Sequence, residues 1–267
     1  MGQCRLCQNP GELQLSHIIP KFAVRWLRES VGGAALRSSA VPNVRIQDGQ
    51  KEYLLCSSCE KMLNHWETEF ATSVFIPYHN NEHQSPSHIR YKKWALKFAV
   101  SLSWRVLEYI YPKIVDRFGP SEQPAIEAAR EVWRKFLLSE VTHPSIFEQH
   151  LLPLEVIAEF RGPKLPPFFN RYLVTTCDMD FVRSENTIFV YSKLCKLFIF
   201  GFIRYSDHDR KIWKGTKLHV NNGHLFAIKD YVIPDNILEF LFDKSNIALN
   251  AHNRMSPKQA EKVITGS

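Results

Sequence analysis

Four of the six cysteines form two C-x-x-C pairs, Cys4/Cys7 and Cys56/Cys59. Each pair can sit on a tight turn that directs two thiolates at one ion, so two pairs complete the tetrahedral set that zinc prefers. A redox role needs only one pair at a helix start in a thioredoxin-like unit, and nothing in the sequence suggests that unit. We therefore predict a structural zinc site.

A histidine interrupts an apolar run that follows the first cysteine pair. In "LQLSHIIPKF" (13–22), His17 stands between Leu15 and Ile18, with Pro20 three residues later. The apolar neighbours predict a strand that enters a core, and successive side chains of a strand point to opposite faces. His17 either points out of the pleat, where it could act on a substrate, or fills the edge of the core.

Polar side chains form one face of the helix predicted after the second cysteine pair. The spacing i, i+4, i+7 places Glu60, Asn64 and Glu67 on this face. The row is either an ordinary solvated surface or a set of hard oxygen ligands of the kind that Mg²⁺ prefers. The buried stripe of the same helix is predicted to be Leu63, Trp66, Phe70 and Val74.

Together these motifs resemble the HNH endonucleases, also called ββα-metal nucleases. Members with a structural zinc ion carry a C-x-x-C pair, a strand with a histidine followed by a proline, an Asn-containing loop, and a second C-x-x-C pair that runs into a helix. The corresponding segments here lie within residues 1–75 and include "SHIIP", "VPNVRIQDG" and "LLCSSCE". The chain also resembles a group of bacterial "SHIIPKF" proteins, some of them from mobile-element or phage-defence loci.

The resemblance implies a role for each matching residue. His17 would be the general base, Asn43 the loop asparagine, and a catalytic Mg²⁺ or Mn²⁺ would bind nearby. The chain departs from the family in three ways: Ser16 stands where an Asp ligand is common, Asn43 lies thirteen residues before Cys56, and Glu60 replaces a His or Asn ligand. Glu60 is the first candidate for the catalytic ion, and the further candidates are Asn64, Glu67 and Asp48.

Two functions from different classes follow. The first is a metal-dependent endonuclease that hydrolyses the phosphodiester bonds of DNA rather than RNA. The second half of the chain would then bind the substrate, regulate the activity or mediate assembly. The second is a catalytically inactive zinc-stapled module that binds nucleic acid or protein. A protein partner encoded at the same locus is compatible with either function.

The bulk composition limits the partners. With 267 residues, of which 45% are hydrophobic, the chain can bury a full core. The net charge is +7, divided into +2 over residues 1–92 and +5 over residues 93–267, and favours a polyanion such as nucleic acid. No apolar run is long enough for a membrane span, and the N-terminus is polar, so we expect a cytoplasmic protein without a membrane partner. In that compartment Cys177 and Cys195, which lie in apolar surroundings, are expected to be inert core thiols.

The pattern of elements predicts an α+β fold in two domains, 1–80 and 92–267, joined by a solvated linker at 77–91. The first domain is the zinc-stapled ββα-metal unit. The second starts with central helices, continues with mostly antiparallel strands and ends with closing helices. Specific expectations for it are a helical stretch at 143–160, a strand at 171–177, an Asn-Gly hairpin at 220–225, and a closing helix at 256–264.

Overall fold

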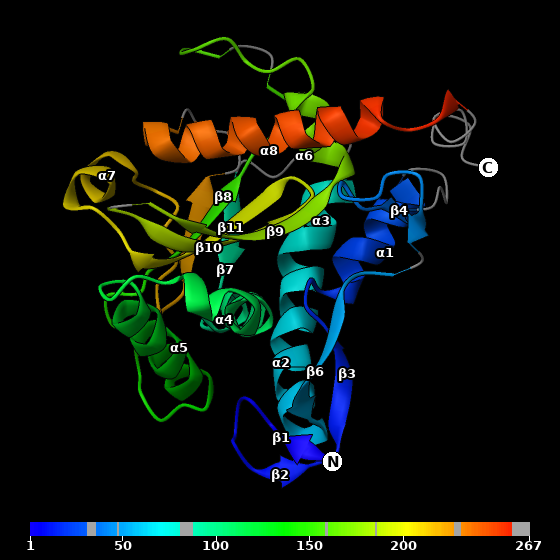
Figure 1. Cartoon of the computed structure of the whole chain (residues 1–267). Coiled ribbons are helices and arrows are strands. Elements are labelled where there is room, and N and C mark those ends of the chain that lie inside the picture. Colours follow the sequence, from blue (N-terminus) through cyan, green and yellow to red (C-terminus); the bar gives the residue numbers. More distant parts are fainter. Residues whose placement is uncertain are drawn as a thin grey trace.

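A computed structural model describes residues 1–30, 36–46, 48–80, 88–157, 160–184, 186–226 and 231–257. It is a mixed α+β fold, built around a four-stranded sheet with helices above and below it (Figure 1). A hairpin with a long helix descends from one side of this sheet, and the N-terminus lies at its far end (Figure 1).

In the N-terminal part, a pair of strands leads into a helix. Strand β3 pairs antiparallel with β6, and β6 runs directly into α2. Leu54 and Leu55 of β6 and Leu63 of α2 are buried in one hydrophobic core. The elements of this part are β1 (Gly2–Gln3), β2 (Pro10–Gly11), β3 (Leu13–His17), α1 (Lys21–Ser30), β4 (Leu36–Arg37), β5 (Arg45–Ile46), β6 (Lys51–Cys56) and α2 (Ser57–Phe70).

Helix α2 continues through one π-helical turn, η1 (Ala71–Phe75), into α3 (Ile76–Asn80). Pro77 explains the wider turn, because its ring would clash with the carbonyl of Ser73 in a regular α-helix. The continuation carries Phe75, Tyr78 and His79 into the interior, where all three are buried.

The second part contains the main sheet. Its strand order is β8-β11-β10-β9, and every neighbouring pair is antiparallel. The elements are β7 (His88–Tyr91), α4 (Trp94–Ile114), the 3₁₀ turn η2 (Val115–Arg117), α5 (Gln123–Leu137), β8 (Gln149–Pro153), α6 (Phe169–Thr175), β9 (Cys177–Arg183), β10 (Ile188–Leu194), β11 (Leu197–Arg204), α7 (Asp207–Ile212), β12 (Gly223–Phe226) and α8 (Asp235–Asn253).

The main sheet is covered on both faces, with α4 and α5 on one side and α6 and α8 on the other (Figure 1). Along β11, Leu197 and Ile199 join the core on the α4 side, whereas Phe198 and Phe200 join the core on the α8 side. This explains why "LFIFGFI" is apolar throughout. Gly201 is required where α4 approaches the sheet, because a Cβ atom there would lie 2.5 Å from Ser103 Oγ.

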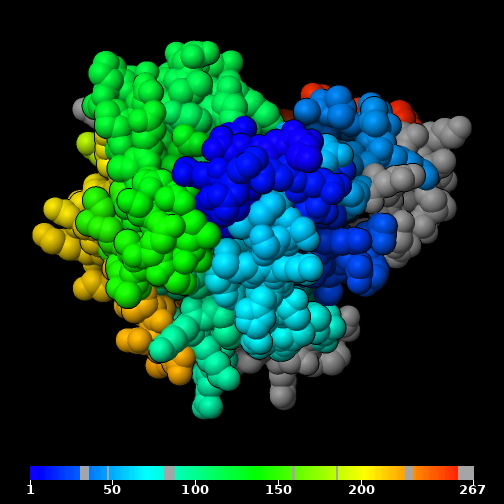
Figure 2. Space-filling model, turned by 90° about the horizontal axis from the view of Figure 1, so that it is seen from below, coloured from blue at the N-terminus to red at the C-terminus, as the bar shows by residue number. Residues whose placement is uncertain are grey.

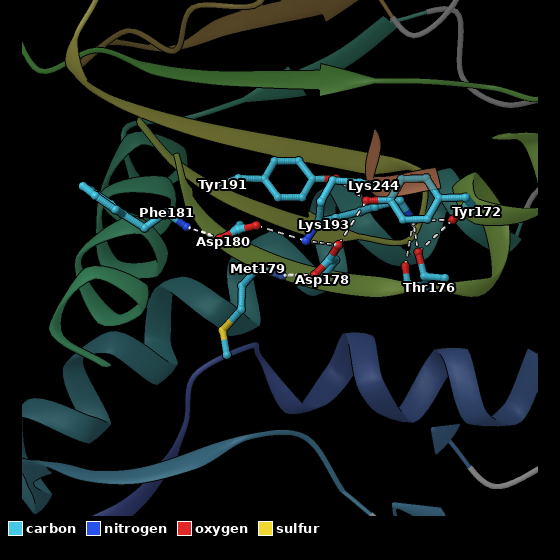
Figure 3. A network of polar contacts seen from close by, with 9 residues as sticks. All are labelled: Tyr172, Thr176, Asp178, Met179, Asp180, Phe181, Tyr191, Lys193 and Lys244. Carbon is cyan, nitrogen blue, oxygen red and sulfur yellow. Dashed lines mark hydrogen bonds and ion pairs between the residues drawn. The ribbon is translucent and has the colours of Figure 1, made fainter. Parts of the chain in front are cut away.

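A buried lysine fixes α6 on the sheet (Figure 3). Lys193 Nζ donates hydrogen bonds to the carbonyl oxygens of Tyr172 at 2.7 Å, Leu173 at 3.0 Å and Thr176 at 2.8 Å, and so caps the C-terminus of α6. Burial lowers the pKa of Lys193 to about 8. Lys244 of α8, which covers the same face of the sheet as α6, pairs with Asp178 and Asp180 of β9.

Three local predictions for the second part were wrong. Residues 143–160, expected to be helical, contain strand β8, which is buried along its whole length and pairs with β11. Residues 171–175, expected to form a strand, belong to α6, which Lys193 caps. The Asn-Gly step gives no local hairpin, because β12 pairs with the distant β7. The closing helix at 256–264 lies almost wholly outside the described residues.

The expected linker is packed at both described ends. Residues 81–87 lie outside the described part, but Tyr78 and His79 before them and Ile89 and Tyr91 after them are buried. The rings of Phe70 and Phe98 stack with centroids 4.0 Å apart, and a single hydrophobic core contains both. The solvated-linker interpretation is therefore wrong for these residues, and the hydrophobic core is continuous across the expected boundary. Within the described residues no helix combines the length and apolar character needed to cross a membrane.

Candidate functional site

The two C-x-x-C pairs meet. The four sulfur atoms of Cys4, Cys7, Cys56 and Cys59 all lie within 4.8 Å of one another, and Cys7 Sγ is 3.8 Å from Cys56 Sγ. Four thiols at this separation could hold a metal ion such as zinc in a tetrahedral site.

Backbone hydrogen bonds place the thiols. Cys4 N donates to Asn9 O and Gln8 N donates to Cys4 O, both at 2.9 Å, which closes the first turn. Arg5 N donates to Leu54 O at 2.9 Å and so attaches this turn to β6. Cys56 ends β6 and Cys59 follows in the first turn of α2, so the strand-to-helix junction fixes the second pair.

The thiols differ in acidity before any metal is considered. A hydrogen bond with Ser58 Oγ, 3.1 Å away, is the main reason that the pKa of Cys56 falls to about 6. Burial raises the pKa of Cys59 well above its ordinary value. A bound cation would favour the thiolate at both positions.

The cysteine turn is supported by the second half of the chain. Seen from below, the N-terminal segment lies against α5 and α2 (Figure 2). Arg134 of α5 donates to Leu6 O at 3.3 Å, and Arg5 pairs with Glu108 of α4 at 3.4 Å. Arg130 donates to the same Glu108 at 2.7 Å, so the arginines around this face have acidic partners.

His17 lies at the end of β3 and is held by an aspartate. His17 Nε2 is 2.8 Å from Asp48 Oδ1, and the other oxygen of Asp48 is 2.6 Å from Lys51 Nζ. With the carboxylate as acceptor, Nε2 carries the proton and Nδ1 keeps its lone pair. Among the described residues the structure gives Nδ1 no hydrogen-bond partner, and the side chain is 17% exposed.

The charge of Asp48 is secured by its neighbours. Burial alone would raise the pKa of this carboxyl, but hydrogen bonds from Lys51, His17 and Gly49 N outweigh burial and hold the pKa well below its ordinary value. Asp48 therefore remains an acceptor for His17 at neutral pH. The sequence suggested Asp48 as a metal ligand, and the structure joins it to His17 instead.

Ser16 and Glu60 meet on the opposite face of β3. Ser16 Oγ donates to Glu60 Oε2 at 2.6 Å, and the serine is almost fully buried. Because successive strand residues alternate, His17 faces outward with the partly exposed Leu15, while Ser16 faces α2. Leu15, expected in the core, is 50% exposed.

The other polar residues of the α2 face have different surroundings. Asn64 is exposed one turn after Glu60. Glu67 is partly buried and lies 2.5 Å from the guanidinium of Arg105, which comes from α4. Arg105 also donates to the carbonyl oxygen of His17 at 2.9 Å. One oxygen of the Glu67 carboxylate is therefore taken up by Arg105.

Asn43 is joined to the end of the chain. Its amide donates to Arg254 O at 3.2 Å and accepts a hydrogen bond from Ser256 N at 2.9 Å. These two bonds tie the β4–β5 loop to the C-terminal end of α8. The structure gives Asn43 no contact with His17 among the described residues.

A hollow of about 290 Å³ opens beside the His17–Asp48 pair. It is lined by Lys21, Val24, Arg25 and Arg28 of α1 together with Asp48. The helix that starts just after Pro20 thus supplies a basic wall next to the histidine.

The sequence prediction missed Arg105, Lys51 and this hollow. Arg105 could have been noticed, because it is one of only three charged residues, with Lys97 and Glu108, in the mostly apolar segment "WALKFAVSLSWRVLEYIY". Lys51 and the hollow depend on loop geometry that no periodic pattern encodes. Cys177 and Cys195 lie with their sulfur atoms 3.8 Å apart at the end of the main sheet, away from the four-thiol cluster.

Comparisons with known proteins find no relative of this chain. No protein-family model matches the chain, and no curated protein or solved structure shows significant similarity to it. The function is therefore argued from the site.

Proposed function

We propose that the protein is a metal-dependent endonuclease of the HNH type, with DNA as the favoured substrate. The proposal is based on two adjacent side chains at the end of β3, which point to opposite faces of the strand. His17, held by Asp48, lies on one face, and Ser16, bonded to Glu60, lies on the other. A candidate base and a candidate metal ligand thus flank one point on the strand, next to a basic hollow.

His17 would act as the general base. Its Nδ1 lone pair can take a proton from a water molecule as that water attacks the phosphorus atom. Asp48 holds the tautomer with the proton on Nε2 and stabilises the imidazolium that forms. Arg105 holds the carbonyl of His17 and so limits movement of the strand end.

A divalent cation would bind on the Ser16 face. Glu60 offers a second carboxylate oxygen, and Asn64 offers an exposed amide oxygen. This small oxygen set suits Mg²⁺ or Mn²⁺, because Mg²⁺ usually keeps several waters and takes only one or two carboxylates from the protein. When bound, the ion would stabilise the charge that develops on the phosphate and the leaving 3′ oxygen.

The four thiols would hold zinc in a structural role. The site is closed by four cysteines, whereas a catalytic zinc site keeps one position for water or substrate. Its position at the β6–α2 junction suits an ion that fixes the hairpin against the helix.

The first test is plasmid nicking with Mg²⁺ by the His17→Ala variant. We expect at least about a 100-fold loss of cleavage, the usual scale for a general base, with zinc content and fold retained. Asp48→Asn should give a smaller loss, because Nδ1 remains while its orienting partner is weakened. Full cleavage by a folded His17→Ala variant would rule out His17 as the base.

The second test separates a ligand role of Glu60 from its place at the helix start. If Glu60 binds the catalytic ion, Glu60→Gln should cleave poorly and recover partly at higher Mg²⁺ or with Mn²⁺. If its charge only favours the start of α2, the variant should lose about 0.3–1 kcal/mol of stability and cleave normally. Normal cleavage at every metal concentration would reject the ligand role.

A zinc-stapled binding module without catalysis is the alternative. It is favoured by Glu67 and Asn43, two candidate site residues that are bound to Arg105 and to the end of α8. This alternative predicts binding of nucleic acid or protein without any nicking of DNA, and the His17→Ala variant should then bind as the wild-type chain does. The nicking assay decides between the two functions.

A further inference from the structure

Three cations follow one face of α1 beside the candidate base. Lys21, Arg25 and Arg28 have the spacing i, i+4, i+7, and all three are exposed. They form the wall of the 290 Å³ hollow, with Val24 between them and Asp48 at its edge. Because the surface is concave, a ligand could contact several of these side chains together.

These cations differ from the arginines of the hollow beside α5. In the larger hollow of about 510 Å³ between the cysteine turn and α5, Arg5 and Arg130 pair with Glu108, and Arg134 pairs with Glu131. Within the described residues, no hydrogen bond or ion pair joins Lys21, Arg25 or Arg28 to any acidic group. Of these two hollows, the one at α1 therefore presents cations that no acidic group among the described residues neutralises.

The one carboxylate in the α1 hollow does not cancel this charge. Asp48 lies 2.6 Å from Lys51 and 2.8 Å from His17, so its charge is offset by partners outside α1. The hollow is therefore cationic and adjoins the residue that holds His17. A ligand with repeated negative charges, extending from His17 along α1, would complement it.

We propose that the exposed face of α1 binds the sugar-phosphate backbone of nucleic acid, next to the phosphate that is attacked by the water molecule activated by His17. This inference rests on the proposed function for the position of the cleaved bond. Lys21 to Arg28 spans about 10 Å along the helix, which is enough to face about three successive phosphates of one strand. Contacts of this kind position the backbone without reading its sequence.

The test measures binding without cleavage. The Arg25→Gln/Arg28→Gln variant is made in the full-length His17→Ala chain and titrated against a labelled DNA duplex between 50 and 200 mM salt, without added Mg²⁺. We expect the affinity to be about 100-fold weaker than that of the His17→Ala chain, since two charge-assisted contacts are lost and each is worth about a factor of ten. The slope of log affinity against log salt should become shallower by roughly 1.8, about 0.9 for each lost phosphate contact.

The matched control is Lys211→Gln/Lys214→Gln in the same background. These lysines are also exposed, and their segment at α7 lies at the opposite end of the molecule from α1 (Figure 1). Equal zinc content and circular dichroism in both variants would show that the fold is intact. The control should keep the salt slope of the parent.

Two results would overturn the inference. One is unchanged affinity and slope in the α1 variant, and the other is an equal loss in the α7 control, which would indicate binding by net charge alone. Because nothing is cleaved in this assay, its outcome is independent of whether His17 is a base. Failure of the proposed nuclease would appear instead as the absence of Mg²⁺-dependent nicking by the wild-type chain.

Discussion

Arg105 connects two parts of the candidate site through a single buried side chain. Only 2% of its side chain is exposed, yet its guanidinium contacts Glu67 of α2 and the carbonyl oxygen of His17. A buried charge of this kind must be paired, because an isolated one would be strongly destabilising. The position of His17 therefore depends on a residue from the second half of the chain.

The single variant Arg105→Met should lower the free energy of unfolding by about 3–5 kcal/mol, because the partly buried carboxylate of Glu67 then has no positive partner. The double variant Arg105→Met/Glu67→Leu removes both charges and should recover most of that stability. We still expect weaker cleavage from the double variant, since His17 O has lost its donor. Chemical denaturation and plasmid nicking measure the two effects. Wild-type cleavage by the stable double variant would limit Arg105 to a structural role.

At the residue scale, the four cysteines could be predicted from the sequence, because two C-x-x-C pairs have few other uses. The direction of His17 could not, because strand alternation places it on the same face as Leu15, which was expected in the core but is 50% exposed. The partner of His17 could not be predicted. Asp48 reaches it across 31 residues of chain that include a loop, and no periodicity determines how such a loop folds back.

Among the elements, the junction of β6 with α2 has the largest effect on the site. It carries Cys56 and Cys59, and it sets the direction in which Glu60 leaves the helix. A metal ion held there would also attach the first cysteine turn, which precedes Cys56 by some fifty residues.

Cys56→Ser should therefore weaken metal binding by more than about 100-fold, since even outer-shell changes cost 10–100-fold. Because metal binding supplies folding free energy, the β3–β6–α2 part should unfold at lower temperature. Cys177→Ser, which lies outside the cluster, should retain the metal. Metal analysis and thermal unfolding test both variants. Full metal content in Cys56→Ser would contradict the assignment.

Helices with one buried face were predicted correctly. α2 and α5 show an apolar stripe at helical spacing, and the structure confirms both helices. Strand β8 and helix α6 were predicted wrongly for two different reasons. β8 is buried on both faces, which erases the alternation of a strand. α6 ends where it does because Lys193, a residue later in the chain, caps it.

For the whole molecule, His79 joins the two halves. Its Nδ1–H donates to Phe75 O at 2.8 Å, and its Nε2 accepts a hydrogen bond from Lys196 N in the β10–β11 turn at 3.2 Å. Only the neutral imidazole can make both bonds. Burial is the main reason that the pKa of His79 falls to about 4 in the folded protein.

The protein should accordingly lose stability in mild acid. An unfolded histidine takes up a proton near pH 6.5, whereas folded His79 does so only near pH 4. Stability from this group is fully present above about pH 6.5 and falls by up to about 3 kcal/mol as the pH approaches 4. His79→Gln keeps a donor and an acceptor without titrating. Denaturation between pH 7.5 and pH 5 should show a shallower decline for this variant, and identical declines would exclude His79 as the cause.

The attachment of the cysteine turn to α5 has a consequence for synthesis on the ribosome. Arg134 of α5 donates to Leu6 O, but the chain between Cys59 and Arg134 takes roughly 4–15 s to translate at about 5–20 residues per second. All four thiols are available before their supporting helix exists. During that interval, the free concentration of the ion determines whether the two cysteine pairs of the nascent chain are joined. Metal supply during growth should therefore set the yield of correctly folded chains.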